Sequence, residues 1–127
     1  MVRRISGLDD LARIFFPDNP NHQRAFVAIW LEIKYADKQF LESSVDLTAR
    51  YDLSPRTLEI VRSKLKKLGL IKRISHFNPI HGYRSGWVFS PRFRSAITGL
   101  SKALSDATMR QTAPLARKKD QAALHYI

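Results

Sequence analysis

The chain has 127 residues, of which 22 are Lys or Arg and 11 are Asp or Glu, so its formal net charge is +11. Hydrophobic residues make up 44%, which is typical of a folded domain and excludes a disordered basic tail. The absence of cysteine excludes disulfides and thiolate-bound metals. Neither a signal-peptide pattern nor an apolar run of membrane-spanning length is present, so we expect a cytoplasmic protein that binds no membrane.

Most of the positive charge is concentrated in the middle of the chain. Residues 1–53 carry 7 basic and 8 acidic side chains, residues 54–94 carry 10 and 1, and residues 95–127 carry 5 and 2. A charge that served solubility alone would be spread evenly along the chain. The balance of +9 in the central segment therefore favours a binding surface for a polyanion, above all nucleic acid.

The N-terminal residues predict two helices. A capping-box pattern at residues 6–9 predicts a short amphipathic helix that ends at Pro17. Asn19, followed by Pro20, predicts the start of a second helix that runs to Tyr35. Apolar residues recur along this second helix at helical spacing, so we expect it to form part of the core.

The central segment predicts a very short strand and two further helices. Residues 40–41 form the strand, and Ser44 is the predicted N-cap of a short third helix. The Ser-Pro pair at residues 54–55 predicts a fourth helix, residues 55–68, which ends at Gly69 because glycine is a favoured C-terminal cap.

The C-terminal part predicts a hairpin and one more helix. Residues 70–76 and 86–90 are the predicted strands, and the residues between them form a long tip. Pro91 opens a helix that ends near residue 107, and residues 108–127 form a basic tail or a loosely docked helix. The elements together predict a mainly α fold with a small β-hairpin, an α+β class.

Two stretches resemble a known DNA-binding family. The segment SVDLTARYDLS at residues 44–54, followed by Arg-Thr-Leu at 56–58, resembles a helix-turn-helix. The segment LKKLGLIKR at residues 65–73 resembles the helix-to-wing junction of winged helix-turn-helix regulators such as the MarR-like family. The resemblance covers roughly residues 20–90 and implies terminal helices that dimerise, so we expect a homodimer whose recognition helices meet half-sites about one DNA turn apart.

This interpretation divides the chain into four parts. They are an N-terminal helix for dimerisation at residues 1–17, a winged helix-turn-helix domain at 18–90, a C-terminal helix for dimerisation at 91–107, and the tail at 108–127.

Residues 55–68 are the expected recognition helix. Leu58, Val61, Leu65 and Leu68 share one face of a helical wheel and should pack inward. The opposite face fits the major groove, where Arg56 would bind a guanine edge and Glu59 would accept a hydrogen bond from cytosine. Ile60 would contact a thymine methyl group or another part of the protein. Alternatively, Glu59 pairs within its own helix, and Lys66 and Lys67 form a solvated surface instead of phosphate contacts.

The hairpin, expected as a wing at residues 75–85, should contact the DNA backbone or the minor groove. Arg84 is the expected minor-groove side chain, and Arg92 with Arg94 would hold a phosphate. His76 and His81 are interpreted as surface histidines and not as metal ligands. The expected DNA-binding residues are Ser54, Arg56, Thr57, Glu59, Ile60, Ser63, Lys66, Lys67, Lys72, Arg73, Arg84, Arg92 and Arg94.

These residues predict a transcriptional regulator that binds double-stranded DNA sequence-specifically. The alternatives are a plasmid or phage replication protein, an architectural DNA-binding protein, or a winged domain for protein contact, which would not need the +9 segment. The sequence contains no Gly-rich phosphate loop, metal-ligand set or nucleophile–base pair, so we expect no enzyme activity, cofactor or metal. A small-molecule effector could bind between the terminal helices and the core, but no residue identifies a ligand.

Overall fold

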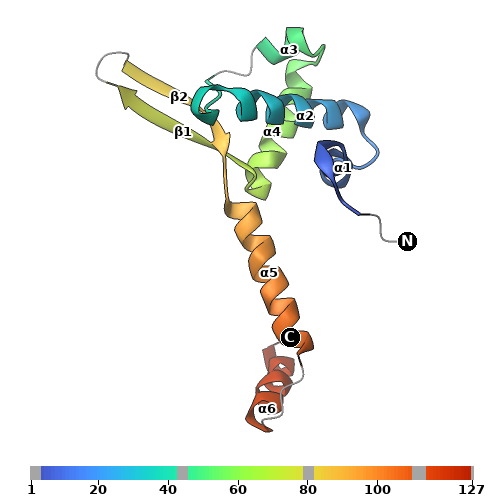
Figure 1. Ribbon diagram of the computed structural model, residues 1–127. Helices are drawn as coiled ribbons and strands as arrows, with labels where there is room; N and C mark the ends of the chain where they lie inside the picture. The colour runs from blue at the N-terminus through green and yellow to red at the C-terminus, as the bar shows by residue number, and fades with distance from the viewer. Residues whose placement is uncertain (1–3, 43–45, 79–81, 110–113, 127) are drawn as a thin grey trace. The chain divides into compact units, whose positions relative to one another are not determined.

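The computed structural model of the chain describes residues 4–42, 46–78, 82–109 and 114–126 (Figure 1). The chain divides into two compact units, Met1–Arg92 and Phe93–Ile127. It is mainly helical with a two-stranded antiparallel hairpin, which confirms the predicted α+β class. The elements of the first unit are α1 (Gly7–Phe15), α2 (Pro20–Tyr35), the 3-10 helix η1 (Asp37–Gln39), α3 (Asp46–Arg50), α4 (Pro55–Leu68), β1 (Ile71–Asn78) and β2 (Gly82–Phe89).

The predicted start of α2 is confirmed, and the capping box predicted for α1 is wrong in its details. The side chain of Asn19 accepts a hydrogen bond from the backbone N–H of His22 at 3.1 Å, and Pro20 is the first residue of α2. At the start of α1, the side chain of Ser6 makes no capping bond. Its backbone N–H donates instead to the Asp10 carboxylate at 2.9 Å, one residue beyond the predicted capping box.

Helices α3 and α4 both end in a left-handed residue that closes the last turn. Gly69 has φ +83°, and the next N–H, that of Leu70, donates to the Leu65 carbonyl at 2.9 Å. This confirms the predicted end of α4. Asp52, with φ +52°, has the corresponding place after α3, where the following N–H donates to the Thr48 carbonyl at 3.0 Å. The turn between α3 and α4 is therefore tight. The predicted cap Ser44 lies outside the described residues.

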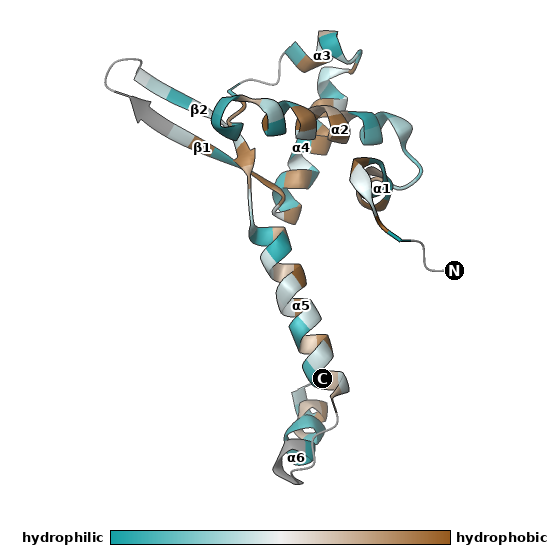
Figure 2. Ribbon diagram, in the orientation of Figure 1, coloured by the Kyte–Doolittle hydropathy of each residue, from teal (hydrophilic) through white to brown (hydrophobic). Residues whose placement is uncertain are grey.

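The core of the first unit lies where α2 crosses α4 (Figure 1). Its largest fully buried side chains are Phe26, Ile29, Ile33, Leu47, Val61, Leu65 and Ile71. Leu58 is also buried and Leu68 is half-buried, which confirms the predicted inward face of α4. Figure 2 shows hydrophobic residues on the parts of α2 and α4 that approach each other. Burial of these side chains is the main favourable contribution to folding of the unit.

Helix α1 packs on α2 within the same unit. Ala12 and Phe16 are buried, and the ring centroids of Phe16 and Phe26 lie 5.9 Å apart. The Lys64 ammonium donates to the Phe15 carbonyl and lies 4.5 Å from the centre of the Phe16 ring. A cation at this point is favourable because it lies at the negative end of the α1 dipole. Much of the apolar face of α1 is therefore used inside the unit.

The hairpin strands are longer than predicted. β1 pairs with β2 from Ile71–Phe89 to Asn78–Gly82, so most of the predicted tip belongs to the ladder. Asn, Pro and Gly residues in the predicted tip are typical of turns, so the sequence pattern ended each strand too early. Asn78 and Gly82 nevertheless pair with each other across the hairpin, and local sequence does not identify such partners. The predicted strand at residues 40–41 is confirmed as a single bridge, in which Leu41 pairs with Trp87.

The absence of a side chain at Gly86 allows residues 40 and 41 to lie close to β2 at this bridge. A Cβ atom at Gly86 would lie 2.6 Å from the Leu41 carbonyl oxygen and 2.7 Å from Cζ of Phe40. Only a residue without a side chain fits there, because real Cβ contacts do not become so short.

Beyond the hairpin lie α5 (Arg92–Thr108), α6 (Pro114–Ala122) and the 3-10 helix η2 (Ala123–Tyr126). The helix predicted after Pro91 is thus confirmed. The predicted tail contains a helix of nine residues, and Arg117, Lys118 and Lys119 are exposed in it. Within the described ranges, no helix is both long and apolar enough to cross a bilayer.

Candidate nucleic-acid interface

The outward face of α4 carries six of the thirteen predicted DNA-binding residues. Because Leu58, Val61 and Leu65 are buried on the opposite face, the helix cannot rotate without breaking the core. The side chains left exposed on this face are those of Arg56, Glu59, Ile60, Ser63, Lys66 and Lys67. Ile60 is 43% exposed and so does not pack inside the unit. The face is mainly cationic, with one carboxylate and one apolar side chain within it.

Three cations on this face have no partner within the described part of the chain. No hydrogen bond or ion pair joins Arg56, Lys66 or Lys67 to another described residue. Glu59 likewise forms no such bond there, and the predicted alternative of a pair within α4 is absent from the described contacts. These charges are therefore available to a ligand.

Ser54 and Thr57 shape the start of α4. The Ser54 hydroxyl accepts from the Thr57 backbone N–H at 3.1 Å and donates to the Thr57 hydroxyl at 2.8 Å. Both hydroxyls are thus engaged with each other in this structure. They define where the first turn of α4, including Arg56, lies.

Polar contacts hold α3 against α2 and so determine where α4 begins. Arg24 donates to the Tyr51 carbonyl at 2.6 Å, and Glu32 accepts hydrogen bonds from Arg50 and from the Tyr51 hydroxyl. Burial and the bond to Glu32 raise the pKa of the Tyr51 phenol, and Glu32 also raises the pKa of Arg50. Arg24 and Arg50, two basic residues of the N-terminal half, therefore stabilise the packing of α3 against α2.

Trp87 joins α4 to the hairpin. Its side chain is only 8% exposed, and the guanidinium carbons of Arg62 and Arg73 lie 5.2 Å and 5.8 Å from its ring centre. Arg73 also donates to the Ser85 hydroxyl at 3.2 Å. These two arginines bring one positive charge of α4 and one of β1 to the same ring. Arg62 was absent from the sequence prediction, because nothing local to it identifies a tryptophan 25 positions later.

The register separates the predicted hairpin cations onto two faces. Paired residues share a face, so Arg73 lies with Trp87, while Lys72 lies with Val88 on the opposite face. Arg84, three residues before Trp87 on the alternating strand, belongs to the face of Lys72. The structure thus places Arg73, but not Lys72 or Arg84, on the Trp87 face that joins the hairpin to α4.

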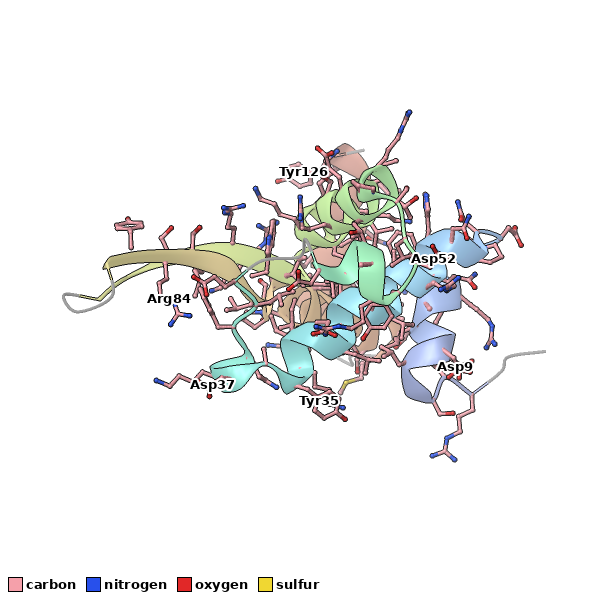
Figure 3. All side chains as sticks on the ribbon, turned by 90° about the horizontal axis from the view of Figure 1, so that it is seen from above. Asp9, Tyr35, Asp37, Asp52, Arg84 and Tyr126 are labelled. Atoms are coloured by element: carbon pink, nitrogen blue, oxygen red, sulfur yellow. The ribbon has the colours of Figure 1, made fainter. Side chains whose placement is uncertain are left out.

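Arg84 is engaged in an ion pair. Its Nη2 lies 2.8 Å from a carboxylate oxygen of Glu42, and Figure 3 shows it extending to the side on which Asp37 lies. The guanidinium lowers the pKa of Glu42, and Glu42 raises that of Arg84. The residue predicted to enter the minor groove therefore holds the segment before α3 against the hairpin.

The remaining predicted sites are distributed more widely. Arg92 and Arg94 are exposed in the first turn of α5. His81 and the side chain of His76 lie outside the described residues. In the described part of the chain, no three His, Asp or Glu side chains form a group that could hold a metal ion.

A groove lies beside α1 and α2 and has a volume of about 370 Å³. Its lining includes Arg13, Val27, Ala28 and Tyr51. It lies between the N-terminal helix and the core, where the sequence left room for a small-molecule effector without identifying one. No family model, curated protein or solved structure matches the chain.

Proposed function

We propose that this protein is a winged helix-turn-helix regulator that binds double-stranded DNA. The observation that carries the proposal is the outward face of α4, where Arg56, Lys66 and Lys67 have no partner among the described residues. The order of elements adds support, since α3, a tight turn, α4 and a hairpin follow one another. A helix of this kind fits the major groove, which admits one α-helix.

Each side chain on α4 has a proposed role. Arg56, in the first turn, binds a guanine edge, and Glu59 accepts from a cytosine amino group. Ile60 contacts a thymine methyl group. Lys66 and Lys67, in the last turn, bind phosphates and position the helix without reading sequence.

The proposed hairpin contact differs from the one expected from sequence. Arg84 would have to leave Glu42 before it could bind DNA. Arg73 is exposed and lies beside Trp87, on the hairpin face that contacts Arg62 of α4. We therefore assign the backbone or minor-groove contact of the hairpin to Arg73.

The proposal is tested by selecting bound duplexes from a random pool at physiological salt with the full chain. Enrichment of one palindromic sequence is the expected result, because a dimeric regulator places two recognition helices on two half-sites. Tight binding without enrichment would support the architectural alternative. No binding to duplex DNA would overturn the proposal and leave protein contact as the function of the hairpin and α4.

A matched pair of variants tests where DNA binds. Replacing Arg56, Lys66 and Lys67 together by Ala should abolish selection of the enriched duplex. Replacing Arg4, Lys34 and Lys38 by Ala removes the same charge from exposed positions elsewhere and should leave the selected sequence unchanged. Equal losses in the two variants would mean that only net charge matters.

A further inference from the structure

The C-terminal part of the chain carries positive charge that the proposed function does not use. Residues 93–127, which form the second compact unit, have six basic and two acidic side chains, a balance of +4. Three of the six basic residues are consecutive, and they lie at the middle of α6 (Figure 1). These three residues, Arg117, Lys118 and Lys119, are the α6 cations. A charge that served solubility alone would be spread along the unit.

The α6 cations are exposed and are not neutralised within the described part of the chain. Every residue from 117 to 126 is exposed. No hydrogen bond or ion pair joins Arg117, Lys118 or Lys119 to another described residue, although Asp120 follows them directly. Their charge is therefore available to an external anion.

The α6 cations leave the helix in different directions. Successive residues of an α-helix are about 100° apart, so the three side chains together span about 200° of its circumference. A flat protein surface touches only one side of a helix and would leave part of this charge in water. A groove of a DNA duplex has phosphates along both of its edges, so cations that fan out from a helix can reach several of them. The arrangement therefore fits nucleic acid better than an acidic protein surface.

We propose that the α6 cations bind phosphates of the same DNA duplex whose bases α4 contacts, as a second contact that does not depend on sequence. This inference rests on the proposed function and gives a role to a segment outside the winged domain. Contacts of Lys and Arg with phosphates hold a protein on DNA without distinguishing bases. Because one chain carries both contacts, binding through α4 raises the effective concentration of α6 near the duplex, and a weak contact then increases the overall affinity.

An anionic membrane surface is the competing ligand for a run of cations. Helices that bind at a membrane surface combine cations with a broad apolar face. Among its nine residues, α6 has a single large apolar residue, Leu115, and so lacks such a face. The exposed Leu124 and Tyr126 belong to the separate 3-10 helix η2. Recognition of a ligand by α6 therefore depends on charge, which favours DNA phosphates.

Neutralising the α6 cations in the full chain tests the proposal. Replacing all three by Gln should lower the magnitude of the slope of log K against log salt concentration by about 3, because each lost phosphate contact removes about 0.9. The loss of affinity should be the same for selected and scrambled duplexes. Replacing Arg4, Lys34 and Lys38 by Gln removes the same charge from exposed positions of the first unit and should keep the slope.

The possible results separate this proposal from the proposed function. If the α6 variant binds duplex DNA with an unchanged slope, or if the control variant loses as much slope, the α6 proposal is overturned and the role of α4 stands. If the unchanged protein does not bind duplex DNA, the proposed function itself fails. Co-sedimentation with vesicles of phosphatidylserine and phosphatidylcholine tests the competing ligand. Vesicle binding that needs the α6 cations, together with DNA binding that does not, would assign them to a membrane surface.

Photo-cross-linking tests direct contact, since the chain has no cysteine of its own. Lys118→Cys, modified with azidophenacyl bromide, should become joined to the bound duplex on illumination. Lys34→Cys, modified in the same way, should not. Absence of a cross-link at position 118, or equal cross-linking at both positions, would show that α6 makes no specific contact with the duplex. Circular dichroism confirms that each variant keeps its helix content.

Discussion

Trp87 illustrates how a single side chain can extend a surface from one element to another. The residue is only 8% exposed, yet its indole ring makes cation–π contacts with Arg62 of α4 and with Arg73 of β1. Contacts between a guanidinium and an aromatic ring contribute about 0.5–2 kcal/mol each, more when they are desolvated. The ring therefore helps to hold Arg73 at the place that we assign to the hairpin contact.

Arg56 is the residue on which base recognition depends in the proposed complex. Replacing it with Ala should cost about 1–3 kcal/mol on the preferred duplex and reduce discrimination against other sequences. Lys67→Ala is the matched comparison, since it removes one positive charge from the same exposed face. It should weaken binding to all duplexes alike, as measured by fluorescence anisotropy with selected and scrambled duplexes. If Arg56→Ala also weakened both equally, Arg56 would be a phosphate contact.

Gly86 offers a stability test at the bridge between β2 and residue 41. A methyl group at Gly86 would overlap the Leu41 carbonyl and the Phe40 ring. Gly86→Ala should therefore lower the free energy of unfolding by about 1–3 kcal/mol in urea denaturation, the usual cost of overpacking. Ser75→Ala, at an exposed position of the same hairpin, should change it by no more than about 0.5 kcal/mol. An equal effect of both substitutions would contradict this packing argument.

At the scale of elements, α4 is held from several sides. The apolar face of α4 packs on α2, Lys64 contacts α1, and Arg62 contacts the hairpin through Trp87. The contacts of Glu32 with the end of α3 hold the element that comes immediately before α4. A recognition helix that is fixed in this way loses little conformational freedom when it binds, and binding is correspondingly stronger.

The ion pair between Glu42 and Arg84 predicts a pH dependence for the attachment of the hairpin. Because Arg84 lowers the pKa of Glu42 in the folded state, the pair stabilises the fold at pH values above the usual glutamate pKa. This contribution is lost as the pH falls through the lowered pKa. The variant Arg84→Met should therefore be less stable than the unchanged protein at pH 7, and the difference should vanish once the pH has fallen below the lowered pKa of Glu42.

Lys72→Met is the control for this prediction, because Lys72 forms no ion pair with another described residue. Its effect on the denaturation midpoint should not depend on pH in the same range. A difference between Arg84→Met and the unchanged protein that persists in acid would mean that Arg84 stabilises the hairpin by packing alone.

At the scale of the whole molecule, charged residues of the N-terminal half form ion pairs within the fold, while the excess basic charge lies in the central segment. Acidic residues of the N-terminal half pair with nearby bases, as in the contacts of Asp9 and Asp10 with Arg13. The segment from residue 54 to residue 94 has only one acidic residue among its 41 positions and carries the excess of basic charge. A concentrated field of this kind attracts a polyanion and speeds its association.

The salt dependence of binding measures how much of this charge meets phosphate. Each neutralised phosphate should contribute about −0.9 to the slope of log K against log salt concentration. Replacing Lys66 and Lys67 together by Ala should reduce the magnitude of the slope by about 2, and replacing Lys34 and Lys38 should leave it unchanged. A slope near zero for the unchanged protein would exclude an interface made of phosphate contacts.

Local signals predicted the boundaries of the helices well. Asn19 and Ser54 accept the capping bonds that their sequence context predicted, and Gly69 ends α4 in the left-handed conformation. These features depend on a few neighbouring residues, so a short sequence contains all the information needed. The hairpin was predicted less well, because strand pairing between Ile71 and Phe89 is decided by residues far apart along the chain.

The sequence by itself determined which face of α4 is apolar, where the charge is concentrated, and where helices begin and end. Only the tertiary structure decided what the individual cations do. It brought Arg84 to Glu42, which lies 42 positions earlier, and it brought both Arg62 and Arg73 to Trp87. The physical reason is that an ion pair or a ring contact requires two groups within a few ångströms. Strand register and helix packing determine these distances, and neither can be predicted from the local sequence around a charged residue.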